Sequence, residues 1–200
     1  LKALRPINST NVAEKTVRGQ YVAGFVRGEE VPGYLEEPDA NAKSKTETFV
    51  AIKAEIDNWR WAGVPFYLRT GKRLPNKTSE VVIYFKRQPH NLFSESFTTL
   101  PQNKLVIRLQ PDEGVEITVM NKVPGLTSSR SMDLQKSKLN LSFSEAFEAE
   151  RIPDAYEKLL LEVMIGNQAL FVRRDEIEQA WTWVDSITVF YTHIPLPTLY

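Results

Sequence analysis

The sequence predicts an α+β fold, a large, mostly antiparallel β-sheet with helices packed on one face. Three observations lead to this prediction. Segments in which apolar and polar residues alternate fill much of the 200-residue chain, and this period of two is typical of half-buried strands. Short turn-forming stretches separate these segments, which favours antiparallel neighbours over strand–helix–strand units. The two segments with helical spacing come after the strands.

The first quarter of the chain is the least regular. Residues 1–17 are mixed and polar, and we expect them to form a lead-in segment or linker. Strand-like residues begin at Gln20 and continue to Phe25. Residues 28–47 are rich in Gly, Pro, Glu, Asp and Lys, a composition that predicts a long loop.

The alternating segments begin after this loop. In residues 50–57 the even positions are apolar, whereas positions 53, 55 and 57 are charged, so a half-buried strand is expected there. A turn is predicted at Pro111–Gly114, between two further alternating segments. The remaining strands are expected at 65–68, 81–85, 105–109, 115–119 and 139–143.

Two helices are predicted at the end of the chain. Asp154 precedes an apolar run and Glu157 follows three residues later, which resembles a capping box, and Gly166 is suited to end that helix. We interpret both acidic residues as helix caps rather than catalysts. A second helix should begin near Asp175. Its expected apolar face consists of Ile177, Ala180, Trp181, Val184 and Ile187.

The composition excludes several classes of function. The chain has 25 basic and 25 acidic residues and a net charge of zero, so it lacks the electrostatic signature of a nucleic-acid or membrane-surface protein. It contains no cysteine, which excludes disulfides and thiolate sites and fits a cytoplasmic location. No apolar run is long enough to span a bilayer. Because there is neither a secretory signal nor an initiator Met, we expect upstream residues to be missing.

The strongest local signal for chemistry is the basic segment 69–77, which holds four cations and no acid. Lys72 and Lys77 lie on either side of a Pro-Asn turn between two expected strands, where two mobile ammonium groups can converge on one phosphate dianion. An ordinary solvated basic turn explains the pattern equally well. The segment is not a Walker loop, and the chain contains no G-x-G-x-x-G dinucleotide motif.

Other catalytic or metal-binding constellations are not found in the sequence. His90 and His193 are far apart and lack metal-type partners at helical or hairpin spacing, so both are interpreted as surface residues. There is no G-x-S-x-G nucleophile motif. We therefore expect no catalytic residue, no metal site and no cofactor-binding residue in this chain.

Five ordered motifs resemble the C-terminal domain of glucose-6-phosphate dehydrogenase, and the bacterial members most closely. They are Thr16–Tyr21, Pro32–Leu35, Asn58–Lys72, Asn103–Pro111 and Asp154–Leu159. The resemblance implies a lead-in segment at residues 1–17, the domain itself at 18–188 and an unmatched tail at 189–200.

The resemblance implies a role for three residues. Two basic residues of the turn contact the sugar phosphate in this family, and they match Lys72 and Lys77 here; Gln110 also matches a position that reaches the substrate. The family oxidises glucose 6-phosphate at C1, passes hydride to NADP and yields 6-phosphogluconolactone, the first oxidative step of the pentose phosphate pathway. Its catalytic histidine and its NADP domain lie upstream of the motifs matched here. The resemblance thus implies that this fragment is inactive alone and that NADP is bound mainly by the missing N-terminal domain.

Further expectations concern assembly and a second cofactor. The family uses the sheet of this domain to associate, which implies a homodimer or tetramer, with glucose 6-phosphate as the small-molecule partner. Some members hold a structural NADP with basic residues at places where this chain has Thr78, Val82 and Thr118, so we expect none here. Two alternatives remain open, a stand-alone non-catalytic oligomerising module and a decayed gene fragment.

Overall fold

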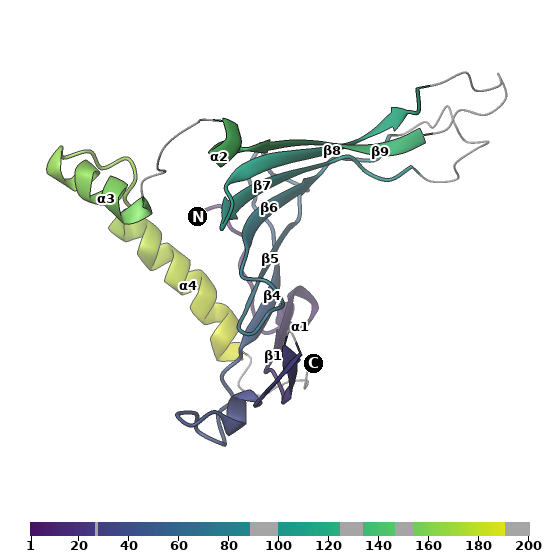
Figure 1. The fold of residues 1–200 in the computed structure, drawn as a ribbon. Coiled ribbons are helices and arrows are strands. Elements are labelled where there is room, and N and C mark those ends of the chain that lie inside the picture. Colours follow the sequence, from purple (N-terminus) through teal and green to yellow (C-terminus); the bar gives the residue numbers. More distant parts are fainter. Residues whose placement is uncertain (27, 89–99, 125–133, 147–153, 191–200) are drawn as a thin grey trace. The chain divides into compact units, whose positions relative to one another are not determined.

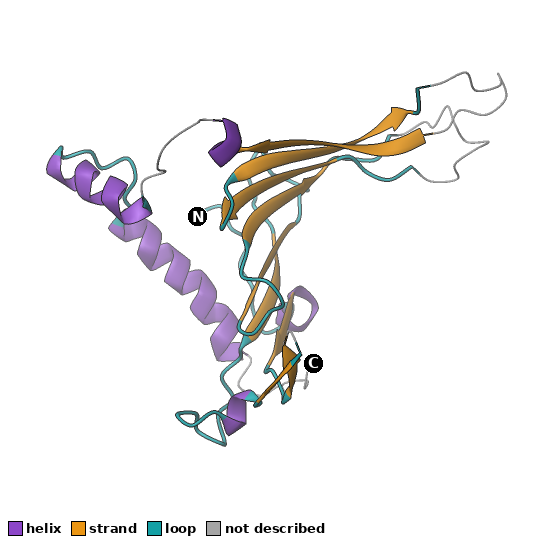
Figure 2. Cartoon of the chain, in the orientation of Figure 1, coloured by secondary structure: helices purple, strands orange, loops and turns teal. Residues whose placement is uncertain are grey.

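The structure is a computed structural model, and it confirms the α+β class (Figures 1 and 2). Two compact units divide the chain: unit 1 is Leu1–Pro75 together with Leu159–Tyr200, and unit 2 is Asn76–Lys158. The structure describes residues 1–26, 28–88, 100–124, 134–146 and 154–190.

The predicted single sheet is instead divided into separate antiparallel sheets. Unit 1 contains the three-stranded sheet β1-β4-β5 and the hairpin β2-β3, and unit 2 contains the four-stranded sheet β6-β7-β8-β9. The strands of unit 1 are β1 (Thr16–Gly19), β2 (Gly24–Val26), β3 (Glu29–Val31), β4 (Phe49–Ala54) and β5 (Phe66–Gly71). Those of unit 2 are β6 (Ser79–Tyr84), β7 (Lys104–Gln110), β8 (Gly114–Lys122) and β9 (Leu134–Ser142). The helical elements are α1 (Val12–Lys15), the 3-10 turn η1 (Tyr34–Glu36), α2 (Phe143–Ala146), α3 (Ala155–Met164) and α4 (Arg174–Phe190).

The long loop predicted for residues 28–47 is wrong in part, because β3 and η1 lie inside it. β3 pairs with β2 around Gly28, which has φ of 87°, a conformation that glycine adopts without strain. In η1, the Glu36 carboxylate accepts a hydrogen bond from the Gly33 N–H at 2.9 Å. A strand of three residues is too short to give an alternation signal, so composition alone suggested a loop.

The core of unit 1 joins residues from both ends of the chain. Its buried side chains are Ile7, Val12, Ala54, Trp183 and Ile187, with Leu4, Ile52 and Phe66 packed against them. Ile52 and Ala54 lie on the same face of β4, and Phe66 pairs with Ala54 across β5. The helix α4, drawn in yellow-green in Figure 1, therefore packs on this face of the three-stranded sheet.

The position of α4 is predicted correctly, but its buried face is predicted only in part, since the expected face includes Ala180 and Ile187 but not Trp183. Trp183 is 9% exposed and Ile187 is 3% exposed, whereas Trp181, which the sequence analysis assigned to the apolar face, is 62% exposed. Ala180, Trp183 and Ile187 are spaced by three and four residues and share one face, while Trp181 lies about 100° away from Ala180 on the helix. Apolar residues occupy two adjacent stripes of α4, and only packing decides which stripe is buried.

The ends of α3 follow the predicted signals. The Asp154 carboxylate accepts a hydrogen bond from the Tyr156 N–H at 2.9 Å, which confirms its role as the cap. The helix ends at Met164, and Gly166 has φ of 72°. The Asn167 N–H then donates to the Glu162 carbonyl at 2.9 Å, as in a glycine-terminated helix.

Unit 2 has one apolar sheet face. Antiparallel pairing aligns two residues from each strand into two rows that cross all four strands. We call these eight side chains the apolar face: Val81, Ile83, Leu105, Ile107, Val115, Ile117, Leu139 and Leu141. Ile83 is 41% exposed and Leu139 is 63% exposed, so the face is left largely uncovered by the described residues.

Candidate functional site

The basic segment 69–77 leads from β5 towards β6. Lys72 directly follows the last residue of β5, and Lys77 lies two residues before the first residue of β6. The boundary between the compact units falls between Pro75 and Asn76, so the two lysines belong to different units. Their convergence on one phosphate stays a prediction.

The backbone at Lys72 is fixed by its neighbours in unit 1. The Lys72 N–H donates to the carbonyl oxygen of Thr48 at 2.7 Å, which extends the pairing of β5 with β4 by one residue. At Gly71, a Cβ atom would lie 2.9 Å from the Phe49 ring and 3.2 Å from the Thr48 oxygen. Glycine is therefore required for β5 to approach β4 this closely. Lys72 itself is exposed, so its ammonium group is accessible to solvent while its backbone is paired with Thr48.

Arg73 differs from the other three cations of the segment. Its guanidinium forms an ion pair with the Glu37 carboxylate and lies 5.2 Å from the centre of the Tyr21 ring. The Tyr21 hydroxyl donates to the same carboxylate at 3.0 Å. The hydrogen bond from Arg73, followed by that from Tyr21, holds the pKa of Glu37 below its usual value. The charge of Arg73 is thus neutralised within unit 1.

Lys72 and Lys77 differ from Arg73 in this respect. Both are exposed, and neither takes part in an ion pair within the part of the chain that the structure describes. An ammonium group without a carboxylate partner is suited to bind a phosphate as a mobile point charge.

Gln110 lies close to the Lys77 segment within unit 2. It is the last residue of β7 and pairs with Ser79, two residues after Lys77. Gln110 is exposed, and its peptide bond to Pro111 is cis. The register therefore brings the predicted side chains Lys77 and Gln110 to the same end of the β6–β7 pair.

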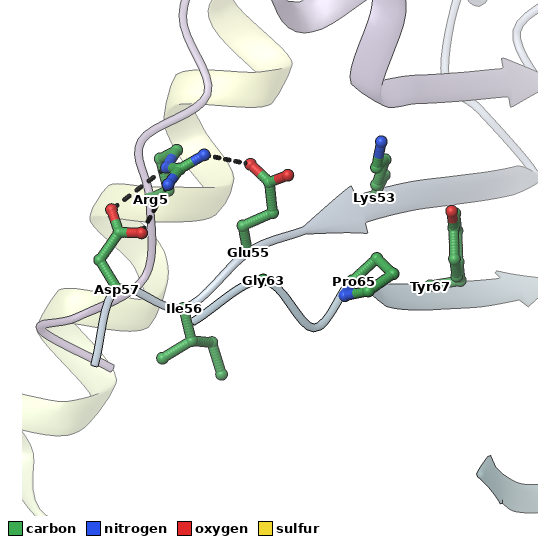
Figure 3. A pocket seen from close by; sticks show the side chains of 8 residues that line it. All are labelled: Arg5, Lys53, Glu55, Ile56, Asp57, Gly63, Pro65 and Tyr67. Atoms are coloured by element: carbon green, nitrogen blue, oxygen red, sulfur yellow. Dashed lines mark hydrogen bonds and ion pairs between the residues drawn. The ribbon is translucent and has the colours of Figure 1, made fainter. Parts of the chain in front are cut away.

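A second polar site, which the sequence analysis did not identify, lies on unit 1 (Figure 3). It is an open cavity of about 230 Å³. Lys53 and Tyr67, which are paired across β4 and β5, lie on one side of it, and an ion-pair cluster lies on the other. The lining residues are Arg5, Lys53, Glu55, Ile56, Asp57, Gly63, Pro65 and Tyr67.

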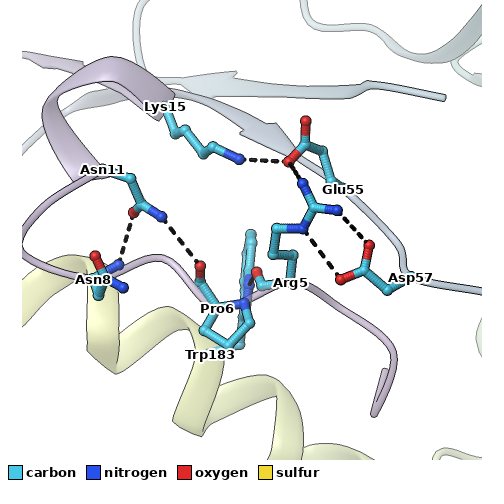
Figure 4. Close-up of polar contacts among 8 residues, drawn as sticks. All are labelled: Arg5, Pro6, Asn8, Asn11, Lys15, Glu55, Asp57 and Trp183. Carbon is cyan, nitrogen blue, oxygen red and sulfur yellow. Dashed lines mark hydrogen bonds and ion pairs between the residues drawn. The ribbon is translucent and has the colours of Figure 1, made fainter. Parts of the chain in front are cut away.

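The acidic groups of this cavity are already paired (Figure 4). Arg5 contacts Glu55 and Asp57, each at 2.7 Å, and Lys15 contacts Glu55 at 2.5 Å. The hydrogen bond from Lys15 lowers the pKa of Glu55, and the one from Arg5 lowers the pKa of Asp57. Carboxylates held ionised by two cations are poor general bases, because a useful base has a pKa near the working pH. The cluster links Arg5 and Lys15 to the segment that directly follows β4.

The histidines and possible metal ligands add no further candidate site among the described residues. His90 and His193 lie outside them. Among the residues that the structure places, no cluster of three or more His, Asp or Glu side chains is suited to hold a metal ion. Within the same residues, no helix is both long and apolar enough to cross a membrane.

Comparisons with known proteins identify relatives along the whole chain. The family model described as "Glucose-6-phosphate dehydrogenase, C-terminal domain" matches residues 1–200. Over 187 residues, or 94% of the chain, the sequence is 66% identical to "Glucose-6-phosphate 1-dehydrogenase" of Dickeya dadantii and covers 38% of that protein. It is 57% identical over 187 residues to the protein of the same name from Rhizobium meliloti, covering 94% of this chain and 37% of that protein.

A solved structure gives the same result for the fold. The structure described as "Glucose-6-phosphate dehydrogenase in complex with its substrate glucose-6-phosphate" superposes with a TM-score of 0.84 at 34% sequence identity. The superposition covers 100% of this chain and 39% of that chain. The chain thus spans less than half the length of the relatives that it matches.

Proposed function

Because the chain belongs to the family of glucose-6-phosphate dehydrogenase C-terminal domains, we propose that it binds the substrate phosphate of such an enzyme. The reaction converts D-glucose 6-phosphate and NADP to 6-phospho-D-glucono-1,5-lactone and NADPH. In this proposal Lys72 and Lys77 bind the phosphate, and Gln110 makes a further contact to the sugar. The observation that supports it most is that Arg73 is paired with Glu37, while Lys72 and Lys77 have no such partner among the described residues.

Binding of the sugar phosphate is explained by the opposite charges of the phosphate and the two lysines. A sugar phosphate is a dianion near neutral pH, and two ammonium groups provide opposite charge and up to six hydrogen-bond donors. Because the phosphate is remote from C1, these contacts are present both in the bound substrate and in the transition state. Contacts of this kind lower KM without changing kcat.

We infer that NADP binds to a part of the complete protein outside this chain. The cavity of about 230 Å³ on unit 1 is below the roughly 300–1,000 Å³ of ordinary ligand pockets. The sequence has no glycine-rich dinucleotide motif. In this proposal the contribution of the chain to the reaction is to bind and orient the sugar phosphate.

Replacing Lys72 or Lys77 by alanine tests the proposed phosphate site. In the complete protein that contains this chain, each substitution should raise KM for glucose 6-phosphate by about 10- to 150-fold with kcat nearly unchanged, because each removes a charge-assisted contact worth about 1.5–3 kcal/mol. Steady-state kinetics with varied glucose 6-phosphate measures both constants. Lys45→Ala is the matched control, because Lys45 is an exposed lysine of unit 1 outside the basic segment. Unchanged KM in both variants would refute the site.

We also propose that the complete protein forms a homodimer or tetramer through the apolar face of unit 2. Eight branched apolar side chains on one side of a sheet form a surface that monomeric proteins rarely leave in water. A two-fold interface brings the same patch of two subunits together, so a continuous apolar face can cover its own copy. The family membership and the exposed fractions of Ile83 and Leu139 support this proposal.

Substitutions at two adjacent residues of β6 test the two faces of the sheet separately. Ile83 is 41% exposed and belongs to the apolar face, whereas Tyr84 is 64% exposed and points to the opposite side of the sheet. Ile83→Lys should lower the molar mass measured by light scattering, because it buries like charges against each other at the interface. Tyr84→Lys adds the same charge to the other face and should leave the mass unchanged. If Ile83→Lys keeps the mass of the parent protein, association does not use this face.

A further inference from the structure

The loop that begins at Lys72 is held at two consecutive residues by different contacts. The Lys72 N–H is bonded to the Thr48 oxygen at 2.7 Å, which fixes the start of the loop to the sheet of unit 1. Arg73 then has φ of 50°, the only positive φ found at a non-glycine residue within the described ranges. This left-handed conformation is unfavourable for a residue with a Cβ atom, so it persists only where surrounding contacts maintain it.

Contacts from two distant segments maintain it. Glu37 follows η1 and forms the ion pair with the Arg73 guanidinium, and Tyr21 lies under that guanidinium with its hydroxyl bonded to Glu37. Tyr21 is itself held in place. Tyr21 packs edge-on against Tyr34, with ring centres 5.9 Å apart, and its N–H donates to the hydroxyl of Thr48 at 2.9 Å. The Arg73 side chain is therefore attached to an ordered part of unit 1.

From this geometry we propose that Glu37 is a positioning residue for Lys72, which it orients through Arg73 while making no contact with the substrate itself. The inference rests on the proposed role of Lys72 in phosphate binding. The N–H of Lys72 is itself bonded to Thr48, and the side chain of the next residue, Arg73, is anchored to Glu37. Fixing the backbone at these two residues lowers the conformational entropy that the lysine loses when it binds a dianion. A loop without the anchor would present the same ammonium group over a wider range of positions.

The anchor also explains why Arg73 is not one of the proposed phosphate ligands. Arg73 lies within the basic segment, but its charge and its planar donors are directed to Glu37 and Tyr21. The ion pair places a negative carboxylate next to the site, and Arg73 balances that charge. The carboxylate stays ionised at neutral pH, because the hydrogen bonds from Arg73 and Tyr21 hold its pKa below the usual range.

Two substitutions test the anchor in the complete protein. Glu37→Gln keeps the size of the side chain but removes its charge, and Arg73→Gly removes the side chain while favouring the positive φ. Each should raise KM for glucose 6-phosphate by about three- to tenfold with kcat changed less than about twofold, a coupling within the range found for contacting residues. Glu30→Gln removes an equal charge from an exposed residue of β3 and should change neither constant. Unchanged KM in Glu37→Gln and Arg73→Gly overturns the proposal.

A double-mutant cycle with Lys72→Ala separates positioning from a general structural role. If Glu37 acts through Lys72, then Glu37→Gln should change KM by less than about twofold once Lys72 is already alanine. A Glu37→Gln effect of the same size in both backgrounds means that Glu37 acts independently of Lys72, and overturns the inference while leaving the phosphate site intact. If Lys72→Ala alone leaves KM unchanged, the proposed function of Lys72 fails, and the inference fails with it for that separate reason.

Discussion

Trp183→Ala should destabilise the protein by about 3–5 kcal/mol, the range found when large buried aromatic side chains are truncated. Trp183 is 9% exposed and packs in the core of unit 1 with Ile7, Val12, Ala54 and Ile187. Its indole N–H also donates to the carbonyl oxygen of Arg5 at 3.0 Å. The substitution removes the packing and leaves both a cavity and a carbonyl group without its partner. Urea unfolding followed by circular dichroism measures the loss.

Trp181→Ala is the matched control for this prediction. It removes the same side chain from the same helix, at a residue that is 62% exposed, and should cost no more than about 0.5 kcal/mol. Equal losses for the two variants would mean that the core of unit 1 does not depend on Trp183.

Gly114→Ala should cost about 3 kcal/mol, near the upper end of the usual cost of overpacking. A Cβ atom at Gly114 would lie 2.4 Å from the carbonyl oxygen of Leu141 and 2.7 Å from a guanidinium nitrogen of Arg108. The arginine side chain can move, but the Leu141 carbonyl belongs to the strand that pairs with β8. The two strands must therefore separate at this end of the sheet. Thermal and urea unfolding both report the change.

Gly24→Ala is the corresponding control in another strand. The nearest atom to a Cβ there is the Val22 oxygen at 4.0 Å, an ordinary van der Waals distance. This variant should stay within about 0.5 kcal/mol of the parent protein. If Gly114→Ala is equally mild, the close approach of β9 to Gly114 is not present in solution.

The fold could be predicted from the sequence where it depends on local patterns. Alternation over residues 50–57, 105–109, 115–119 and 139–143 correctly located β4, β7, β8 and β9, because side-chain direction in a strand depends only on position parity. Helix ends at Asp154 and Gly166 were likewise marked by the residues that satisfy the terminal backbone groups.

The features that depend on distant contacts could not be predicted in this way. Alternation does not say which strand pairs with which, so the division into separate sheets was not visible. The burial of Trp183 rather than Trp181 depends on where α4 meets Ala54 and Ile7. Ile7 and Val12 are core residues of unit 1, although they lie in a mixed polar stretch without periodicity. The domain boundaries at residues 18 and 188 stay predictions.

The candidate site was only partly visible in the sequence. The cluster of cations predicted either a phosphate site or a solvated turn, and only the resemblance to a family selected Lys72, Lys77 and Gln110. The partner of Arg73 could not be found from spacing, because Glu37 is 36 residues away. It also lies in a stretch whose composition predicted a loop.

Because the core of unit 1 combines residues from both ends of the chain, its parts are synthesised at different times. Ile7 and Val12 leave the ribosome before Trp183 and Ile187 have been made, and at about 5–20 residues per second the wait lasts roughly 10–35 s. Unit 2 is continuous in sequence, and its strands pair with their nearest neighbours along the chain. It is therefore able to fold while translation continues. Ile7 and Val12 cannot be buried against Trp183 and Ile187 until α4 has been synthesised.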